Sequence, residues 1–184
     1  MRWMIASDIH GSALYCRMML ERYRLEKASR LLLLGDLLYH GPRNDLPQGY
    51  APKEVIHLLN SCAEELVAVR GNCEAEVDQM VLGFPVMADY ALLPTENGLI
   101  YITHGHHASE TAPPPLKKGD ILLHGHTHVP KCVDHGNYIY MNPGSVAIPK
   151  DGSRHSYMIW DGVKFEWKDL ETGETYMEYP KCRG

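Results

Sequence analysis

Three apolar runs in the first half of the chain are each followed by a polar turn and then by a helical pattern. The runs are residues 2–6, 30–34 and 65–69. Helices are expected over residues 12–27, over residues 53–62 and from about residue 73 onward. Ser12 is a typical cap for the first of them. Because strands that alternate with helices form parallel sheets with helices packed on them, this half predicts an α/β fold.

From Val86 onward the pattern changes to short strands at close spacing. They are expected over residues 90–93, 99–103, 120–124, 138–141, 157–160 and 164–168. Asn97-Gly98 and Asp161-Gly162 are typical hairpin turns between such strands. The second half therefore predicts a mostly antiparallel sheet that packs face to face on the first sheet, with the helices outside.

Size and composition are those of a soluble globular protein. The 184 residues, 45% hydrophobic and 22% charged, predict one domain over residues 1–184. A net charge of −5 without a basic run disfavours a long nucleic-acid partner. The chain lacks the ~20 consecutive apolar residues of a membrane span, and it becomes polar at Asp8, too early for a secretory signal. Five cysteines without a Cys-x-x-Cys pair suit reduced thiols, so we expect a cytoplasmic protein.

Potential metal ligands follow the apolar runs. They are Asp8, His10, Asp36, Asn72, His104, His126 and His128. Parallel strands place such residues together at the carboxyl edge of their sheet. Asp8 and His10 are two residues apart, so both can face one cation, whereas a carboxylate such as Asp36 can bridge two cations. A buried and unpaired Asp36 would be costly, and a metal removes that cost.

Single members of this set carry little weight. Asn72 can be a metal ligand through its amide oxygen, but Gly-Asn is also common in turns. His126 and His128 alternate as strand residues do, and a lone His is usually structural. The whole set at the ends of strands favours metal-assisted hydrolysis of a phosphate ester over a coincidental polar network.

The motifs resemble those of the calcineurin-like metallophosphoesterase superfamily. They are Asp8-Ile9-His10, Gly35-Asp36, Gly71-Asn72, His104 and Gly125-His126-Thr127-His128. The small size, residues 103–106 and residues 142–145 resemble its small prokaryotic phosphodiesterase branch. The resemblance covers essentially the whole chain. It implies a four-layer αββα sandwich with two mixed β-sheets flanked by helices.

The resemblance also implies a dinuclear metal site. Asp8, His10 and His128 would hold the first metal ion. Asn72, His104 and His126 would hold the second, with Asp36 between them. This branch usually works with Mn²⁺, and Fe²⁺ or Zn²⁺ also suits such mixed ligands. Two ions about 3.5–4 Å apart would activate a bridging hydroxide for in-line attack on a small phosphodiester.

One position departs from the family pattern. The His that follows Gly-Asn in the family is Cys73 here, and a thiol with a reference pKa of ~8.5 is a weak general acid at neutral pH. We therefore expect a preference for good leaving groups, with Asp36, Cys73 and His106 as the catalytic candidates. His106 either supplies the missing phosphate contact or proton, or supports a ligand. The turn over residues 142–145 either binds phosphate through backbone N–H groups or only joins two strands.

Other functions stay open at this point. A phosphomonoesterase or a nucleotide pyrophosphatase would use the same site, and a non-catalytic scaffold module like the retromer subunit would share the fold. The presence of all seven ligand types favours an enzyme. The tail over residues 172–184 contains Tyr176, Met177 and Tyr179, and it packs either on the sheet or on a second subunit. We expect a homodimer.

Overall fold

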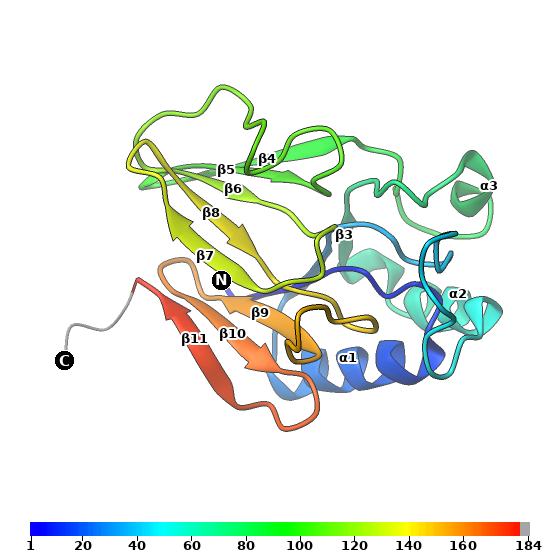
Figure 1. The fold of residues 1–184 in the computed structure, drawn as a ribbon. Coiled ribbons are helices and arrows are strands. Elements are labelled where there is room, and N and C mark those ends of the chain that lie inside the picture. The colour runs from blue at the N-terminus through cyan, green and yellow to red at the C-terminus, as the bar shows by residue number, and fades with distance from the viewer. Residues whose placement is uncertain (181–184) are drawn as a thin grey trace.

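The computed structural model describes residues 1–180 and shows two β-sheets packed face to face, with helices against one of them (Figure 1). The first sheet has the strand order β11-β10-β9-β1-β2-β3. Its strands are β1 (Trp3–Ala6), β2 (Arg30–Leu33), β3 (Leu66–Ala68), β9 (Ser156–Trp160), β10 (Phe165–Asp169) and β11 (Thr175–Tyr179). β1, β2 and β3 run parallel, which confirms the predicted βαβ arrangement of the first half.

The second sheet has the strand order β4-β5-β6-β8-β7. Its strands are β4 (Tyr90–Thr95), β5 (Gly98–Thr103), β6 (Asp120–Leu123), β7 (Lys131–Asp134) and β8 (Tyr138–Asn142). β5, β6 and β8 are parallel, and β4 and β7 are antiparallel edge strands. Two mixed sheets in an α/β sandwich confirm the fold class expected from the resemblance.

The expectation that the later strands form one mostly antiparallel sheet is wrong. β9, β10 and β11 extend the first sheet, where β9 runs antiparallel to β1. All five residues of β9 are buried, and a strand buried on both faces belongs in the middle of a sheet. The long connection over residues 104–119 allows β5 and β6 to lie parallel, because parallel neighbours need a crossover.

The main helices are α1 (Ala13–Leu25) and α2 (Pro52–Asn60). Ser12 caps α1 as predicted, because its Oγ accepts a hydrogen bond from the N–H of Tyr15 at 3.3 Å. A 3₁₀ turn, η1 (Ala63–Glu65), precedes β3. The helix expected from Cys73 is only one turn, α3 (Glu76–Gln79), since Glu74 is turned inward instead.

Two apolar layers hold the sheets and helices together. Met19 and Leu20 of α1 pack with Leu31 and Leu33 of β2 on the outer face of the first sheet. Between the sheets lies a second cluster, made by Ile5, Leu32, Leu34, Ile102, Met141 and Trp167. The strands thus bury alternate side chains on two sides, which fixes their register and the position of the loops at their ends.

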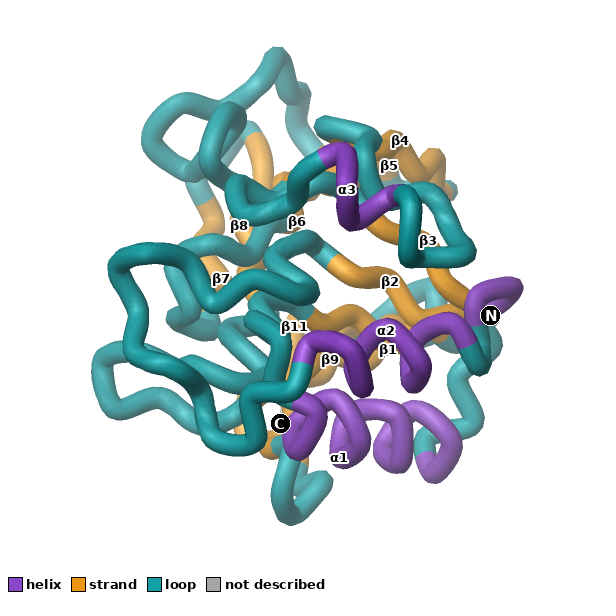
Figure 2. The backbone as a smooth tube through the Cα atoms, turned by 90° about the vertical axis from the view of Figure 1, so that its right-hand side faces the viewer, coloured by secondary structure: helices purple, strands orange, loops and turns teal. Residues whose placement is uncertain are grey.

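The loops that follow β1, β2, β3, β5 and β6 meet at one end of the sandwich. Figure 2 looks onto this end, with α1 and α2 in the lower part, α3 in the upper part and most of the loops beside them on the left. Residues 175–179 of the tail form β11 on β10, so this part packs on the sheet, and residues 181–184 and Cys182 lie outside the described part. Within residues 1–180 no helix is long and apolar enough to span a membrane.

Candidate metal centre

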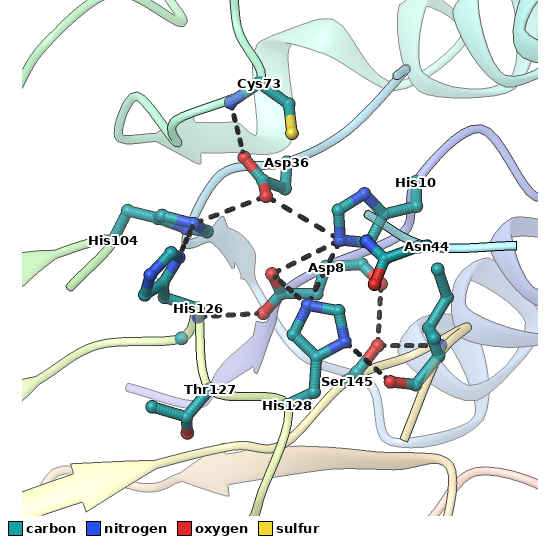
Figure 3. Close-up of polar contacts among 12 residues, drawn as sticks. Asp8, His10, Asp36, Asn44, Cys73, His104, His126, Thr127, His128 and Ser145 are labelled. Atoms are coloured by element: carbon teal, nitrogen blue, oxygen red, sulfur yellow. Dashed lines mark hydrogen bonds and ion pairs between the residues drawn. The ribbon is translucent and has the colours of Figure 1, made fainter. Parts of the chain in front are cut away.

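The first group of predicted ligands comes together where β1 and β6 end (Figure 3). Nε2 of His128 lies 3.2 Å from Oδ1 of Asp8 and 3.2 Å from Nε2 of His10. Nε2 of His10 lies 3.6 Å from the same Oδ1 of Asp8. All three side chains are buried. One carboxylate oxygen and two imidazole nitrogens therefore face a common point.

The second group lies beside the first and shares Asp36 with it. Nε2 of His104 is 3.4 Å from Oδ2 of Asp36, 3.2 Å from Oδ1 of Asn72 and 3.2 Å from Nδ1 of His126. The same Oδ2 of Asp36 is 3.6 Å from Nε2 of His10 in the first group. Asp36 is thus the carboxylate between the two groups, as Figure 3 shows.

Backbone carbonyls fix the orientation of three of these histidines. Nδ1 of His10, of His104 and of His128 each lies within hydrogen-bond distance of a carbonyl oxygen, which can only accept. The carbonyls are those of Tyr39, Leu34 and Ile148, at 2.8, 2.6 and 2.6 Å. Each Nδ1 therefore carries the proton when the ring is neutral, and each Nε2 presents a lone pair to the centre.

The buried carboxylates and ring nitrogens of this centre favour the binding of a cation. Oδ1 of Asp8 is buried without a hydrogen-bond partner, and it faces Nε2 lone pairs. Burial lowers the pKa of His104, but Asp36 and Asp8 outweigh burial and raise it to about 9. Burial raises the pKa of Asp8, but His10 and His128 hold it well below its ordinary value. A carboxylate and lone pairs of this kind fit divalent metal ions, which can supply the positive charge that protons otherwise provide.

The backbone at the centre is strained. Five of the seven residues have positive φ angles: Asp8 59°, His10 48°, Asp36 56°, His126 67° and His128 63°. Such a conformation costs a residue with a side chain about 1–2 kcal/mol, and strain of this kind clusters at functional sites. The turns hold these side chains inward at the expense of stability.

Glu74 supports this centre and was missed by the sequence analysis. Its carboxylate is buried and accepts hydrogen bonds from the N–H groups of Asp36 at 2.8 Å, Leu37 at 2.7 Å and Gly71 at 2.5 Å. The N–H of Cys73 donates to Oδ1 of Asp36 at 2.9 Å. Gly71 is required for this contact, because a Cβ there would lie 2.2 Å from Oδ1 of Asp36. No signal in the sequence singled out Glu74, because its burial and its hydrogen bonds are visible only in the structure.

The turn over residues 142–145 ties the ligand loops together. Ser145 Oγ donates to the carbonyl of Asp8 at 2.8 Å, and Asn142 Nδ2 donates to the carbonyl of Gly125 at 2.7 Å. The N–H of Gly144 is used within the turn, by Oδ1 of Asn142 at 2.8 Å. Of the two predicted roles for this turn, the contacts favour the structural connection over phosphate binding.

Cys73 and His106 lie near the centre in different settings. Sγ of Cys73 can lie against the same cation as His10 and Asp36. Burial and the Asp36 carboxylate raise the pKa of the Cys73 thiol, so it is neutral at pH 7. The ring centroid of His106 is 5.5 Å from that of His104, and burial together with His104 lowers the pKa of His106 to about 4. The thiol and the imidazole are therefore both neutral at pH 7, and a role for either in catalysis stays a prediction.

A small pocket opens over the centre. Five of the seven predicted ligands line it, namely His10, Asp36, Asn72, His126 and His128, together with Cys73. A larger cavity of about 410 Å³ lies between the other ends of the sheets, beside Trp160 and Phe165, and none of the seven residues lines it. The converging ligands, and not the cavity volume, identify the functional site.

Comparison with known proteins gives consistent matches. The sequence profile of the calcineurin-like phosphoesterase superfamily domain matches residues 1–164. Phosphodiesterase YfcE from Escherichia coli (strain K12) is 46% identical over 161 residues, 88% of this chain and 88% of that protein. The solved structure of Yfce, a phosphoesterase from E. coli, superposes with a TM-score of 0.93 at 42% identity over 97% of this chain and 98% of that one. Vps29 from Entamoeba histolytica, complexed with Zn²⁺, has a TM-score of 0.62 at 20% identity over 96% of both chains, which shows the fold alone.

Proposed function

The chain belongs to the calcineurin-like phosphoesterase superfamily and is a metal-dependent phosphodiesterase, and we propose that it cleaves small phosphodiesters at two divalent metal ions. The sharing of Asp36 between two groups of ligands supports this proposal most directly. Asp8, His10 and His128 would hold one ion, and Asn72, His104 and His126 the other. Mn²⁺ is the proposed metal, with Fe²⁺ or Zn²⁺ as alternatives for the same ligands.

The chemistry follows from these groups. Two such ions would supply an activated water, hold phosphoryl oxygens and offset the negative charge that develops in the reaction. The carboxylates of Asp8 and Asp36 are buried, and the histidines are already oriented. The ligand side chains therefore need no rearrangement to hold the ions. The neutral thiol of Cys73 lies in the pocket but is a poor proton donor, so leaving groups that depart without a proton are favoured.

The net charge of the chain supports a small substrate. At −5 it provides no positive electrostatic field to attract a long nucleic acid. Cys16, Cys62 and Cys73 are free thiols, which supports a cytoplasmic protein. We also propose that residues 1–184 act as one domain and that the protein is a homodimer.

The test is hydrolysis of bis(p-nitrophenyl) phosphate and p-nitrophenyl phosphate by metal-stripped protein, before and after Mn²⁺ is added back. Diester hydrolysis should appear with Mn²⁺ and fall by more than about 100-fold in Asp36→Asn, since even groups that only support a ligand are worth 10–100-fold. Asp45→Asn, an exposed change in the neighbouring loop, is the matched control and should keep full activity.

The other candidate functions predict different results. Faster hydrolysis of the monoester would identify a phosphomonoesterase. Absence of hydrolysis by folded protein that has bound two metal ions would contradict the proposal and favour a scaffold role.

A further inference from the structure

Two basic side chains without ionic partners stand at the rim of the pocket over the metal centre. They are Arg43 and Lys150, and both are exposed. Within residues 1–180 neither side chain has an ion pair or a hydrogen bond. Some basic residues elsewhere are paired, as Lys168 and Arg2 are with Glu26, each at 2.5 Å, whereas Arg24 and Lys53 in the described part also lack an ion pair. The charges of Arg43 and Lys150 are therefore available to a ligand.

The two side chains come from loops on different sides of the pocket. Arg43 belongs to the loop between β2 and α2, where a Cβ on Gly41 would lie 3.4 Å from Sγ of Cys73. Lys150 belongs to the loop before β9, and its N–H donates to the carbonyl of His128 at 3.3 Å. One cation thus stands on the Cys73 side of the centre and the other on the His128 side.

Backbone contacts hold both loops in place. Asn44 Nδ2 donates to the carbonyl of His40 at 2.8 Å, and Asn44 lines the pocket beside His10 (Figure 3). Ser153 Oγ donates to the carbonyl of Lys150 at 2.6 Å. The two side chains are exposed, but the backbone that carries them is anchored. Their position at the rim is therefore set by the fold.

The charge at the rim exceeds what the reacting group needs. A simple phosphodiester carries one negative charge, and two divalent ions held by Asp8, Asp36 and the neutral ligands would leave the centre positive without a further cation. Asp36 is the carboxylate among the residues that line the pocket, whereas Asp45 and Asp151, near the two cations in the sequence, are exposed and do not line it. Guanidinium groups bind phosphate through two hydrogen bonds, and an ammonium group adds a point charge.

We propose that Arg43 and Lys150 form a subsite for a second phosphate on the substrate. This inference rests on the proposed phosphodiesterase function and names its substrate class. The preferred substrates are small phosphodiesters in which one alcohol carries a further phosphate, as in an ester of a nucleoside bisphosphate. The reacting phosphodiester would lie at the metal centre, and the second phosphate would lie at the rim.

The test compares two chromogenic esters that differ only in that phosphate. They are thymidine 5′-(p-nitrophenyl phosphate) and the same compound with a 3′-phosphate. The Mn²⁺-loaded protein should have a KM about tenfold lower for the 3′-phosphorylated ester, as expected for a charge-assisted hydrogen bond at a partly exposed site. The difference should shrink as ionic strength rises, because salt screens exposed charges.

Variants test whether Arg43 and Lys150 cause this difference in KM. Arg43→Gln and Lys150→Gln should each reduce the preference and the double variant should abolish it, with kcat for the unphosphorylated ester unchanged. Arg24→Gln, which removes an exposed charge near the end of α1, is the matched control and should keep the preference. Binding of thymidine 3′,5′-bisphosphate against thymidine 5′-monophosphate, measured by calorimetry, should show the same pattern without turnover.

Two results would overturn the subsite. One is equal KM and equal binding of the paired compounds in the wild-type protein. The other is an equal loss for both compounds in the variants, which would place the cations at the reacting phosphate. Failure of the proposed function looks different, because neither ester would be hydrolysed while the bisphosphate would still bind more tightly than the monophosphate.

Discussion

Replacement of Glu74 removes the carboxylate that holds the Asp36 turn and the Gly71 turn together. One oxygen, Oε2, accepts from the N–H groups of Asp36 and Gly71, and the other, Oε1, accepts from the N–H of Leu37. In Glu74→Gln the amide oxygen can keep the two bonds of Oε2. The amide NH₂ then faces the N–H of Leu37, and two donors cannot bond to each other.

The size of the effect follows from these three bonds. One buried N–H without an acceptor costs about 1–3 kcal/mol, so Glu74→Gln should lower the free energy of unfolding by that amount. Glu74→Ala leaves all three groups without an acceptor and should cost about 3–9 kcal/mol. Burial and the nearby charge of Asp36 raise the pKa of Glu74 to about 7, so the buried Glu74 carboxylate is itself unfavourable. Its removal offsets part of the cost, and both losses in free energy of unfolding should lie near the lower ends of these ranges.

Urea unfolding of the metal-free proteins measures these differences, and Mn²⁺ titration measures the consequence for the site. Glu74→Gln should also bind Mn²⁺ about 10–100-fold more weakly, because Asp36 is no longer held. Glu76→Gln, an exposed change two residues away, is the control and should stay within about 0.5 kcal/mol of the wild type. Wild-type stability and Mn²⁺ affinity in both Glu74 variants would refute the reasoning.

Three further predictions concern strain, pH and the leaving group. His126→Asn should stabilise the metal-free protein by up to about 1 kcal/mol, a rise of about 2–4 °C in Tm, because Asn tolerates φ of 67° better, while Mn²⁺ should stabilise it less than the wild type. Burial raises the pKa of Glu26, but hydrogen bonds, chiefly from Lys168, leave it lowered. Glu26→Gln should therefore be less stable than the wild type at pH 7. Thermal melts should show this difference in stability disappearing as the pH falls below 4.5. Rates on aryl phosphodiesters should fall steeply as the pKa of the leaving phenol rises, because the thiol of Cys73 is a poor acid, and a flat dependence together with no effect of His106→Ala would rule out both catalytic hypotheses.

The parts of the fold that depend on local pattern could be predicted from the sequence. β1, β2 and β3 follow from apolar runs, and the polar turns after them place Asp8 and Asp36 at the carboxyl edge of the parallel strands. Only short segments are involved, and their order in the chain matches their order in space. The position of the candidate site follows from the same rule.

The partners of the later strands could not be predicted in this way. β9 pairs with β1 across more than half of the chain, and pairing over such a distance is not encoded in the residues of either strand alone. The uninterrupted burial of Ser156–Trp160 was the local sign of a central strand, but a short apolar run fits either sheet. The sheet that a strand joins is decided by packing, which depends on the whole chain.

The support of the site was also beyond sequence reasoning. Glu74 stands where a helix was expected, and its inward turn depends on two N–H groups of the loop after β2 and on the N–H of Gly71 in its own loop. The positive φ angles of the ligands also depend on the contacts between loops, because Asp and His adopt them more often than most residues do but still only in a minority of cases. Ligand types can be recognised in a sequence, whereas the network that orients them requires the structure.

Anomalous X-ray diffraction from crystals of the Mn²⁺-loaded protein tests the dinuclear centre most directly. Two manganese peaks should appear, one among Asp8, His10 and His128 and the other among Asn72, His104 and His126, with Asp36 in contact with both. A single peak, or manganese bound without Asp36, would contradict the dinuclear centre.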